Sequence, residues 1–494
     1  MTETSSPPTS GLRGSIGVAG IVFLVVAASA PLTAIGGALP VMLAIGNGAG
    51  SPAAFIVVAL VLLVFSVGFA AMSRHVVDAG AFYAYITEGL GRRMGLGAGG
   101  LALLCYTSIQ AAVYGLAGAT AQGLVIQIGG PDLPWWSWSL LLMLAVGALG
   151  YRNIDVGAKV LGVALTLEIA VIAVVAAAVL AQGGASGIDT VSFTPTAFFS
   201  GAPGIGIMFA VASFIGFEAT AIYGEEARDA RRTVPAATYV AVVLIGVFYA
   251  LASWAFVLAF GSGDVVAAAQ ADPDMIFTAA AVYVSPIVAQ IMVVLLLTSL
   301  FAALLAFHNA IARYLFSLGR KGVAPTALSR THPKHGSPYM GSLTQTASAA
   351  VAVGVFALAG ADPVLQLFTW MGGVATISVL LLMVLTSISV IVFFARSGVD
   401  GRLWHTRVAP TLGTLGLMGL VALVLWNFTT LIDGSVVLAG GLLALVVATF
   451  VLSAAIPARG SREAAGAVED AAPVDLADPV EDAAPVEDVT PAAI

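Results

Sequence analysis

The sequence predicts an all-α membrane protein with twelve transmembrane helices. Sixty per cent of its 494 residues are hydrophobic and only 9% are charged, whereas a soluble domain carries about a quarter charged residues. Its apolar runs last about 20 residues, the length of a membrane-spanning helix, rather than the alternating ten of a barrel strand. This composition excludes a soluble enzyme and a nucleic-acid-binding protein, which requires a basic face.

Polar residues separate the apolar runs from one another and set the limits of each predicted span. A run of this length crosses the bilayer as one helix. The twelve spans are expected at about 16–45, 52–72, 97–128, 135–150, 154–181, 200–226, 235–260, 286–316, 341–360, 364–394, 409–428 and 435–456.

The basic residues orient this arrangement in the membrane. In the twelve-span arrangement all 19 Lys and Arg residues fall on one side, and adding or removing one span would scramble that pattern. The positive-inside rule makes the basic side cytoplasmic, so both termini of this multi-pass protein of the cytoplasmic membrane are expected inside the cell. The opposite loops hold acidic residues instead: Asp132, Asp189, Asp264, Asp272, Asp274, Asp362 and Asp433.

The composition divides the chain into a body and two polar ends. Residues 14–456 form the predicted twelve-helix body, and residues 1–13 are a short polar arm expected to be disordered in the cytoplasm. Residues 457–494 repeat Val-Glu-Asp-Ala-Ala-Pro-Val and are strongly acidic. A segment of this composition stays disordered, so we interpret it as a solvated cytoplasmic tail.

Two of the predicted spans, the first and the sixth, contain helix-breaking residues. A backbone group freed inside the bilayer costs several kcal/mol, so such breaks are tolerated only where they line a cavity. The breaks lie five spans apart, which predicts an inverted repeat of 14–181 and 200–394, with helices 11 and 12 at 409–456 added. The alternative is that the glycines only permit close helix packing. The residues concerned are Ser29, Ala30, Pro31, Gly36 and Gly37 in span 1, and Gly201, Pro203, Gly204, Gly206 and Gly216 in span 6.

The sequence around span 6 resembles the amino acid–polyamine–organocation (APC) permeases. The segment 214–218, Phe-Ile-Gly-Phe-Glu, is followed by paired glutamates, basic residues and a proline that opens span 7. Two further stretches agree with that pattern, 78–85 after span 2 and 312–325 after span 8, and the resemblance extends over about 14–456. It implies a leucine-transporter-like fold that works by alternating access and imports an amino acid or a related amine.

The two breaks are the expected substrate site. Free N–H groups from about Thr33 to Gly37 can hold a carboxylate at the positive end of a helix. Free carbonyls near the breaks can hold an ammonium group. The family's usual Gly-x-Gly break is here Ser29-Ala30-Pro31, so the contacts to the substrate's head group stay open. The candidate substrate-binding residues are Ser29, Ala30, Pro31, Thr33 and Gly36 in span 1, Ser213, Phe214, Ile215, Gly216 and Phe217 in span 6, and Tyr106 and Gln110 in span 3.

Glu168, near the middle of span 5, is the first candidate for proton coupling. An ionised carboxylate at that depth costs a few kcal/mol, which favours its protonation. Proton-coupled relatives carry a lysine at about this place, so the role of Glu168 cannot be inferred from them. The alternative is a protonated glutamate bonded to a neighbouring helix. Glu218 and the titratable His308 are further candidates, each with a structural hydrogen bond as the alternative.

Charged residues after span 6 predict a salt bridge at the cytoplasmic face, with a gating or structural role. The acidic partners are Glu225 and Glu226, and the basic partners are Arg228, Arg231 and Arg232. In span 8, the hydroxyls of Thr298 and Ser299 can mimic a sodium site or bond to their own helix.

No metal-ligand spacing, nucleotide-binding loop or catalytic triad is present in the sequence. We therefore expect no cofactor and no enzyme activity, but a secondary transporter with proton symport and a small amine-bearing substrate. The alternatives are a polyamine or organocation carrier, an amino acid exchanger without proton coupling and, from another class, a membrane nutrient sensor.

Overall fold

The computed structural model describes residues 16–76, 82–152, 158–222, 227–320 and 322–456, all within one unit that ends at Ile456. Among these residues every regular element is helical, and the one extended pairing is a parallel bridge between Ile16 and Ala227. The predicted arm 1–13, the tail 457–494 and the pair Glu225 and Glu226 lie outside the described residues.

Ten helical segments of the described chain are long and apolar enough to cross a membrane. The first is interrupted and consists of α1 (Val18–Ala28), the π-helix η1 (Thr33–Ala38) and α2 (Leu39–Ile45). The others are built on α3 (Ser51–Met72), α5 (Arg92–Gln127), α7 (Ala158–Gln182), α11 (Ala230–Phe260), α14 (Pro286–Arg320), α15 (Tyr339–Leu358), α16 (Thr369–Ser397), α17 (Ala409–Leu431) and α18 (Val436–Ala454).

Two of the predicted spans are not among these ten segments. The fourth predicted run forms α6 (Trp135–Arg152), which has only 18 residues and begins Trp-Trp-Ser-Trp-Ser. The sixth run is divided into α9 (Pro203–Ala212) and α10 (Ala219–Ile222) by turns between them. A helix of ten residues rises about 15 Å, half the hydrocarbon thickness, so neither piece spans alone.

Helices also appear where the sequence analysis placed loops. The stretch between the seventh and eighth runs folds into α12 (Val265–Ala271) and α13 (Met275–Tyr283), which are bent by 110° at a short break. Helix α11 begins at Ala230, so Pro235 lies inside it rather than opening it as predicted. Pro235 is the sixth residue of α11, so it leaves the Arg231 carbonyl without its usual helical N–H partner.

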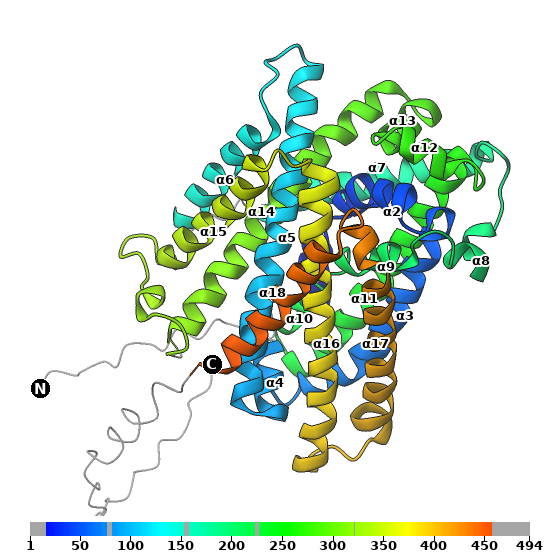
Figure 1. Ribbon diagram of the computed structural model, residues 1–494. Helices are drawn as coiled ribbons and strands as arrows, with labels where there is room; N and C mark the ends of the chain where they lie inside the picture. The colour runs from blue at the N-terminus through cyan, green and yellow to red at the C-terminus, as the bar shows by residue number, and fades with distance from the viewer. Residues whose placement is uncertain (1–15, 77–81, 153–157, 223–226, 321, 457–494) are drawn as a thin grey trace, which may run out of the picture. The chain divides into compact units, whose positions relative to one another are not determined.

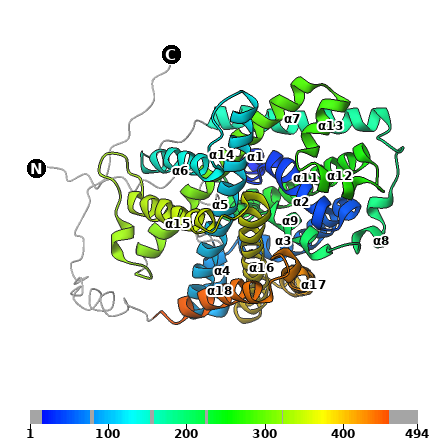
Figure 2. The same ribbon diagram turned by 45° about the horizontal axis from the view of Figure 1, so that its top comes forward.

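Helix α5 is the most deeply buried of the spanning helices, and α18 is the most exposed. Helix α5 contacts α14, α16 and α18, and it runs beside α16 through the middle of Figures 1 and 2. A second group of helices consists of α3 with α11 and α17, both of which α3 contacts. These two groups of helices flank the broken helices between them.

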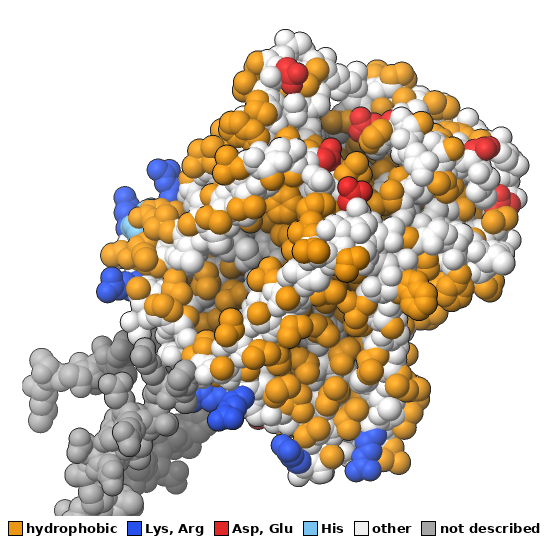
Figure 3. Space-filling model, viewed as in Figure 1, with side chains coloured by type: hydrophobic (Ala, Val, Ile, Leu, Met, Phe, Trp, Pro, Cys, Tyr) orange, Lys and Arg blue, Asp and Glu red, His pale blue; other side chains and the backbone are white. Residues whose placement is uncertain are grey.

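Charged side chains lie at the two ends of the molecule (Figure 3). Lys and Arg side chains gather at the end of α16 that is lowest in the view and on the left near the ends of α6 and α15, whereas Asp and Glu side chains lie in the upper part of the view. The surface between these ends is mainly hydrophobic. This distribution is typical of a protein with a band of lipid contact around its middle.

Backbone hydrogen bonds connect the first helix to the start of the sixth predicted run and to the residues just after it. On the side of α2, the Ala202 N–H donates to the Gly46 carbonyl at 3.0 Å. On the side of α1, the Arg228 N–H donates to the Ile16 carbonyl at 3.1 Å. The two interrupted segments are thus held side by side, and their breaks face each other at one level.

Candidate functional site at two helix breaks

The break in the first helix is enforced by its backbone. Helix α1 ends at Ala28, and Ala30 has a φ of +46°, in the left-handed region that non-glycine residues rarely adopt. Pro31 has no N–H to continue the helical hydrogen bonds. The Tyr249 hydroxyl of α11 donates to the freed Ser29 carbonyl at 3.0 Å. A strained backbone held in this way by its surroundings is typical of a functional site.

The second break, between α9 and α10, approaches the first through a glycine. Gly216 has a φ of +111°, which favours glycine. A Cβ atom at this position would also lie 3.0 Å from the Cβ of Ala28. Gly216 is therefore required both for its backbone conformation and for the close contact between the two breaks.

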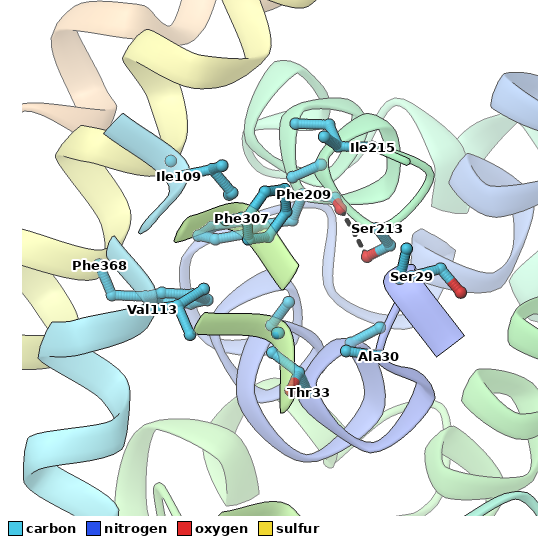
Figure 4. A pocket seen from close by; sticks show the side chains of 16 residues that line it. Ser29, Ala30, Thr33, Ile109, Val113, Phe209, Ser213, Ile215, Phe307 and Phe368 are labelled. Carbon is cyan, nitrogen blue, oxygen red and sulfur yellow. Dashed lines mark hydrogen bonds between the residues drawn. The ribbon is translucent and has the colours of Figure 1, made fainter. Parts of the chain in front are cut away.

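A cavity of about 50 Å³ lies between the two breaks. Figure 4 shows side chains from both broken segments and from the neighbouring helices pointing into it. None of its lining residues is charged, and its polar side chains are Ser29, Thr33 and Ser213. The complete lining is Ala28, Ser29, Ala30, Thr33, Ala34, Ala38, Ile109, Val113, Phe209, Ala212, Ser213, Ile215, Ala303, Phe307, Phe368 and Gly372.

Five of the twelve predicted substrate-binding residues line this cavity, namely Ser29, Ala30, Thr33, Ser213 and Ile215. Seven do not, namely Pro31, Gly36, Tyr106, Gln110, Phe214, Gly216 and Phe217. Of these, Pro31 lines a second, smaller cavity beside Tyr249.

The apolar walls of the cavity were not predicted from the sequence. Ile109 and Val113 of α5 lie beside the predicted Gln110, and Phe307 lies beside the predicted His308. Ile109 and Val113 are four residues apart, which places them on one helix face, so this apolar wall could have been predicted from their spacing. Phe368, which ends η6 (Pro363–Phe368), carried no comparable signal.

The three polar side chains that line the cavity all donate their hydroxyl hydrogens to the protein. Ser29 donates to the Val26 carbonyl and Ser213 to the Phe209 carbonyl, each at 2.8 Å. The second of these bonds is the dashed line in Figure 4. Thr33 donates to the Ser299 hydroxyl at 3.4 Å.

The buried carboxylate of Glu168 lies one hydroxyl away from the cavity. The Ser299 hydroxyl of α14 donates to it at 2.8 Å. The backbone N–H of Leu32, the first donor after Pro31, also donates to it. Glu168 of α7 thus joins three elements: its own helix, α14 and the second half of the broken first helix. The side chain of Thr298, in contrast, is exposed and bonds to its own helix.

Glu218 is held at the second break. The Tyr106 hydroxyl of α5 donates to one carboxylate oxygen at 2.9 Å, and the Gly216 N–H donates to the other at 2.9 Å. The Tyr106 ring lies 6.4 Å from the ring of Phe307, which lines the cavity. A single tyrosine therefore separates this second buried acid from the cavity.

His308 and Gln110 lie behind the cavity walls and hold helices together. His308 pairs with the Ser342 hydroxyl of α15 at 2.7 Å. Gln110 donates to the Leu304 carbonyl of α14 at 3.0 Å and accepts a hydrogen bond from Gln345 of α15. Polar contacts of this kind commonly join helices inside a membrane.

The predicted basic partners lie at the start of α11. The side chains of Arg231 and Arg232 are exposed, and Arg232 forms an ion pair with Asp229 at 3.7 Å. Arg228 contacts Ile16 through its backbone. In the described part of the chain, no group of three or more His, Cys, Asp or Glu side chains could hold a metal ion.

Both individual known proteins and a family model are similar to this chain. The low-affinity putrescine importer PlaP of Escherichia coli K12 is 25% identical to it over 312 residues, and PlaP of Escherichia coli O157:H7 matches equally. The match covers 61% of this chain and 66% of each importer, so the chain spans slightly less than two thirds of their length. The family model described as amino acid permease matches residues 23–456. The chain therefore belongs to the amino acid permease family, whose members are membrane transporters of the APC type and not enzymes.

Proposed function

We propose that this transporter imports an amino acid or a related amine across the cytoplasmic membrane by alternating access, together with a proton. The observation that carries the proposal is the buried Glu168 carboxylate, which connects to the cavity through Ser299 and Thr33. An acid inside the membrane is expensive and is usually functional. Glu168 provides one proton-binding group beside one small-molecule cavity.

Proton binding at Glu168 would act directly on the broken helix. An ionised carboxylate only accepts hydrogen bonds, and it accepts those of Leu32 and Ser299. A protonated carboxyl is neutral and has less capacity to accept hydrogen bonds, so protonation would weaken these two contacts. Protonation of Glu168 would therefore weaken the contact between α7 and the second half of the first helix.

The membrane arrangement we propose has twelve spans. Ten are the long apolar helices, the eleventh is the short α6, and the twelfth is α9 with α10 and the turns between them. The two breaks would then occupy corresponding places in an inverted repeat. The basic end would face the cytoplasm with both termini.

Tyr106 and Glu218 would form an inner gate. Their hydrogen bond joins α5, which packs in the middle of the molecule, to the turn that follows α9. In this proposal, separation of these two elements would open a path from the cavity to the basic end. Phe217, a predicted substrate-binding residue, instead packs against Phe65 and Phe69, which favours a core role.

The small cavity suggests a contracted state of the transport cycle. Ligand sites commonly measure about 300–1,000 Å³, whereas this cavity measures about 50 Å³. Substrate binding would therefore accompany a separation of the two breaks from α5 and α14. The similarity to putrescine importers favours a second candidate, a polyamine carrier.

The test is uptake into proteoliposomes of labelled amino acids and amines, with and without an inward proton gradient. The proposal expects concentrative uptake that needs the gradient in the wild-type protein and is lost in Glu168→Gln. Uptake that occurs only when the same substrate is preloaded inside would instead indicate an exchanger. Binding without any transport would favour a sensor.

A further inference from the structure

The loop of residues 330–338, which precedes α15, is fixed to the end of α6. The buried Ser337 hydroxyl donates to the Tyr151 carbonyl of α6 at 2.6 Å. Within the loop, the His332 N–H donates to the Ser337 carbonyl at 2.8 Å, and the Gly336 N–H donates to the His332 carbonyl at 2.9 Å. Gly336 has a φ of +66°, which favours glycine. The loop is therefore closed on itself and attached to a second element.

The imidazole of His332 has one ring nitrogen that faces donors of the protein. The backbone N–H groups of Lys334 and His335 donate to its Nδ1 atom at 3.2 and 3.3 Å. Because Nδ1 accepts these bonds, the neutral ring holds its hydrogen on Nε2. The rings of Tyr151 and Tyr339 flank this imidazole at 5.2 and 5.8 Å and fix its orientation. His332 thus presents a single N–H donor to a ligand.

Basic side chains surround the second imidazole, that of His335. Its ring lies 4.7 Å from the ring of His332. Partial burial lowers the pKa of His335, and so do its neighbours His332, Lys334 and Arg152, which are all basic. In the described part of the chain, neither Arg152 nor Lys334 forms an ion pair with a carboxylate. An anion at this position would relieve the repulsion among these groups.

This cluster lies where two helices end on the same side of the molecule. Helix α6 ends at Arg152, and α15 begins at Tyr339. Lys, Arg and His side chains lie together near these helix ends, on the left of Figure 3. The first N–H groups of α15 add partial positive charge. The proposed orientation places this side in the cytoplasm, where basic pockets beside membrane helices meet anionic lipid headgroups.

From these observations we propose that Arg152, His332, Lys334 and His335 bind a phosphate group at the cytoplasmic surface. Guanidinium, ammonium and imidazole N–H groups all donate to phosphate oxygens. The two cations would repel a metal ion from the imidazole pair. The phosphate would belong to the headgroup of an anionic phospholipid or to a soluble phosphate ester. None of the four residues lines the cavity between the breaks, so this site does not depend on the transported substrate.

Titration of the histidine side chains, followed by NMR, tests the site, because the chain has only five histidines. The purified full chain is placed in nanodiscs of phosphatidylcholine alone, of phosphatidylcholine with phosphatidic acid, or of phosphatidylcholine with millimolar pyrophosphate in the buffer. A bound phosphate should raise the midpoint of the His335 titration by about one pH unit. A shift with phosphatidic acid identifies a lipid headgroup, and one with pyrophosphate identifies a soluble phosphate. No shift with either probe would overturn the proposal.

His75 provides the internal control for the general charge of the membrane surface. It is exposed after α3, and its ring packs against Phe393 and Phe394 near the end of α16, where other basic side chains gather. Anionic lipids raise the midpoint of any histidine close to the surface. Equal shifts of His75 and His335 with phosphatidic acid would therefore contradict a lipid site at the cluster.

Arg152→Gln and Arg330→Gln form a matched pair of variants. Arg152 acts on His335, whereas the exposed Arg330 of the same loop is not among the groups that do. In phosphatidylcholine alone, Arg152→Gln should raise the His335 midpoint, because one repelling cation is lost. It should also increase about tenfold the amount of phosphatidic acid or pyrophosphate needed for half of the shift. The same midpoint and the same half-maximal amount in both variants would overturn the assignment of Arg152.

Discussion

The Ser299 hydroxyl donates a hydrogen bond of 2.8 Å to the Glu168 carboxylate and accepts one of 3.4 Å from Thr33. A buried acid on α7 is thereby connected to a cavity that its side chain does not line. Glu168 also accepts the N–H of Leu32 at the helix break. The protonation of one side chain can therefore affect both the shape of the broken helix and the polar groups around the cavity.

Glu168→Gln should abolish uptake driven by a proton gradient, because the amide keeps the size of the side chain and cannot take up the proton. Uptake in proteoliposomes measures this. Thr166→Ala is the control on the same helix, because Thr166 is exposed and bonds only to the Gly162 carbonyl. Gradient-driven uptake at the wild-type rate in Glu168→Gln would show that the coupling proton binds elsewhere.

Ser299→Ala should slow proton-driven uptake about tenfold, since it removes one hydrogen bond to a carboxylate, which is worth about 1.5 kcal/mol or more. Its neighbour Thr298 provides the control: Thr298→Ala removes an exposed hydroxyl that bonds only to the Leu295 carbonyl. The measurement is the initial rate of uptake as a function of the outside pH. If the two alanine variants gave the same pH profile, Ser299 would have only a packing role.

Tyr106→Phe should open the proposed inner gate. The variant keeps the ring but loses the hydrogen bond of 2.9 Å to Glu218. The neighbouring Cys105 is the single cysteine of the chain and is buried, so its reaction with a thiol reagent reports on opening without any added label.

We expect the labelling rate of Cys105 to rise about tenfold in Tyr106→Phe, which corresponds to the loss of about 1.4 kcal/mol. Cys105→Ala supplies the background signal. A labelling rate unchanged from that of the wild-type protein would mean that the Tyr106–Glu218 bond does not hold the gate closed.

The helix breaks were predictable in part, because proline and glycine favour a break through their own backbone. Pro31 and Gly216 lie at the observed interruptions, whereas Pro203, Gly204 and Gly206, which were predicted to break span 6, lie in the continuous helix α9. Glu168 was identifiable because an acid within an apolar run is costly in any fold. These residues therefore indicate the region of the cavity from the sequence alone.

The partners of these residues were not predictable, because they come from distant parts of the chain. Glu168 and Ser299 are 131 positions apart, and Tyr106 and Glu218 are 112 apart. No local pattern shows that Leu32 donates to Glu168 rather than to a substrate. The helices α12 and α13 were missed for a related reason: each is too short for its periodicity to distinguish it from a loop.

Gly216→Ala should destabilise the protein by about 1–3 kcal/mol, because the residue has a φ of +111° and its new methyl group would contact Ala28. Thermal unfolding in detergent measures the change. Gly123→Ala is the matched control, since a methyl group added to Gly123 in α5 would meet no other atom within 4 Å, and alanine favours a helix there. Equal unfolding temperatures for the two variants would refute the close contact between the breaks.

Asp400→Asn should lower stability slightly and in a pH-dependent way. Asp400 lies outside the spanning helices and accepts hydrogen bonds from the Arg402 guanidinium, with Nη2 to Oδ2 at 2.6 Å and Nε shared between Oδ1 at 3.0 Å and Oδ2 at 3.1 Å. The backbone N–H of Arg402 also donates to Oδ1 at 3.0 Å. The Arg402 guanidinium holds the pKa of the Asp400 carboxyl well below its usual range. The Arg402 side chain is 48% exposed, so solvent screening limits the contribution of the pair to about 1 kcal/mol or less.

The sign of the pH dependence follows from the lowered pKa of Asp400. The ionised pair stabilises the folded state above the ordinary carboxyl pKa of about 3.9, and that contribution is lost as the pH falls toward the lower folded value. Unfolding temperatures of the wild-type protein and Asp400→Asn should therefore differ by a constant amount between about pH 5 and 8. Their difference should shrink only below about pH 4, because protonation of Asp400 then makes the two proteins electrostatically alike. A difference that instead grew on acidification would mean that Asp400 is protonated in the folded protein and that its contact with Arg402 is not an ion pair.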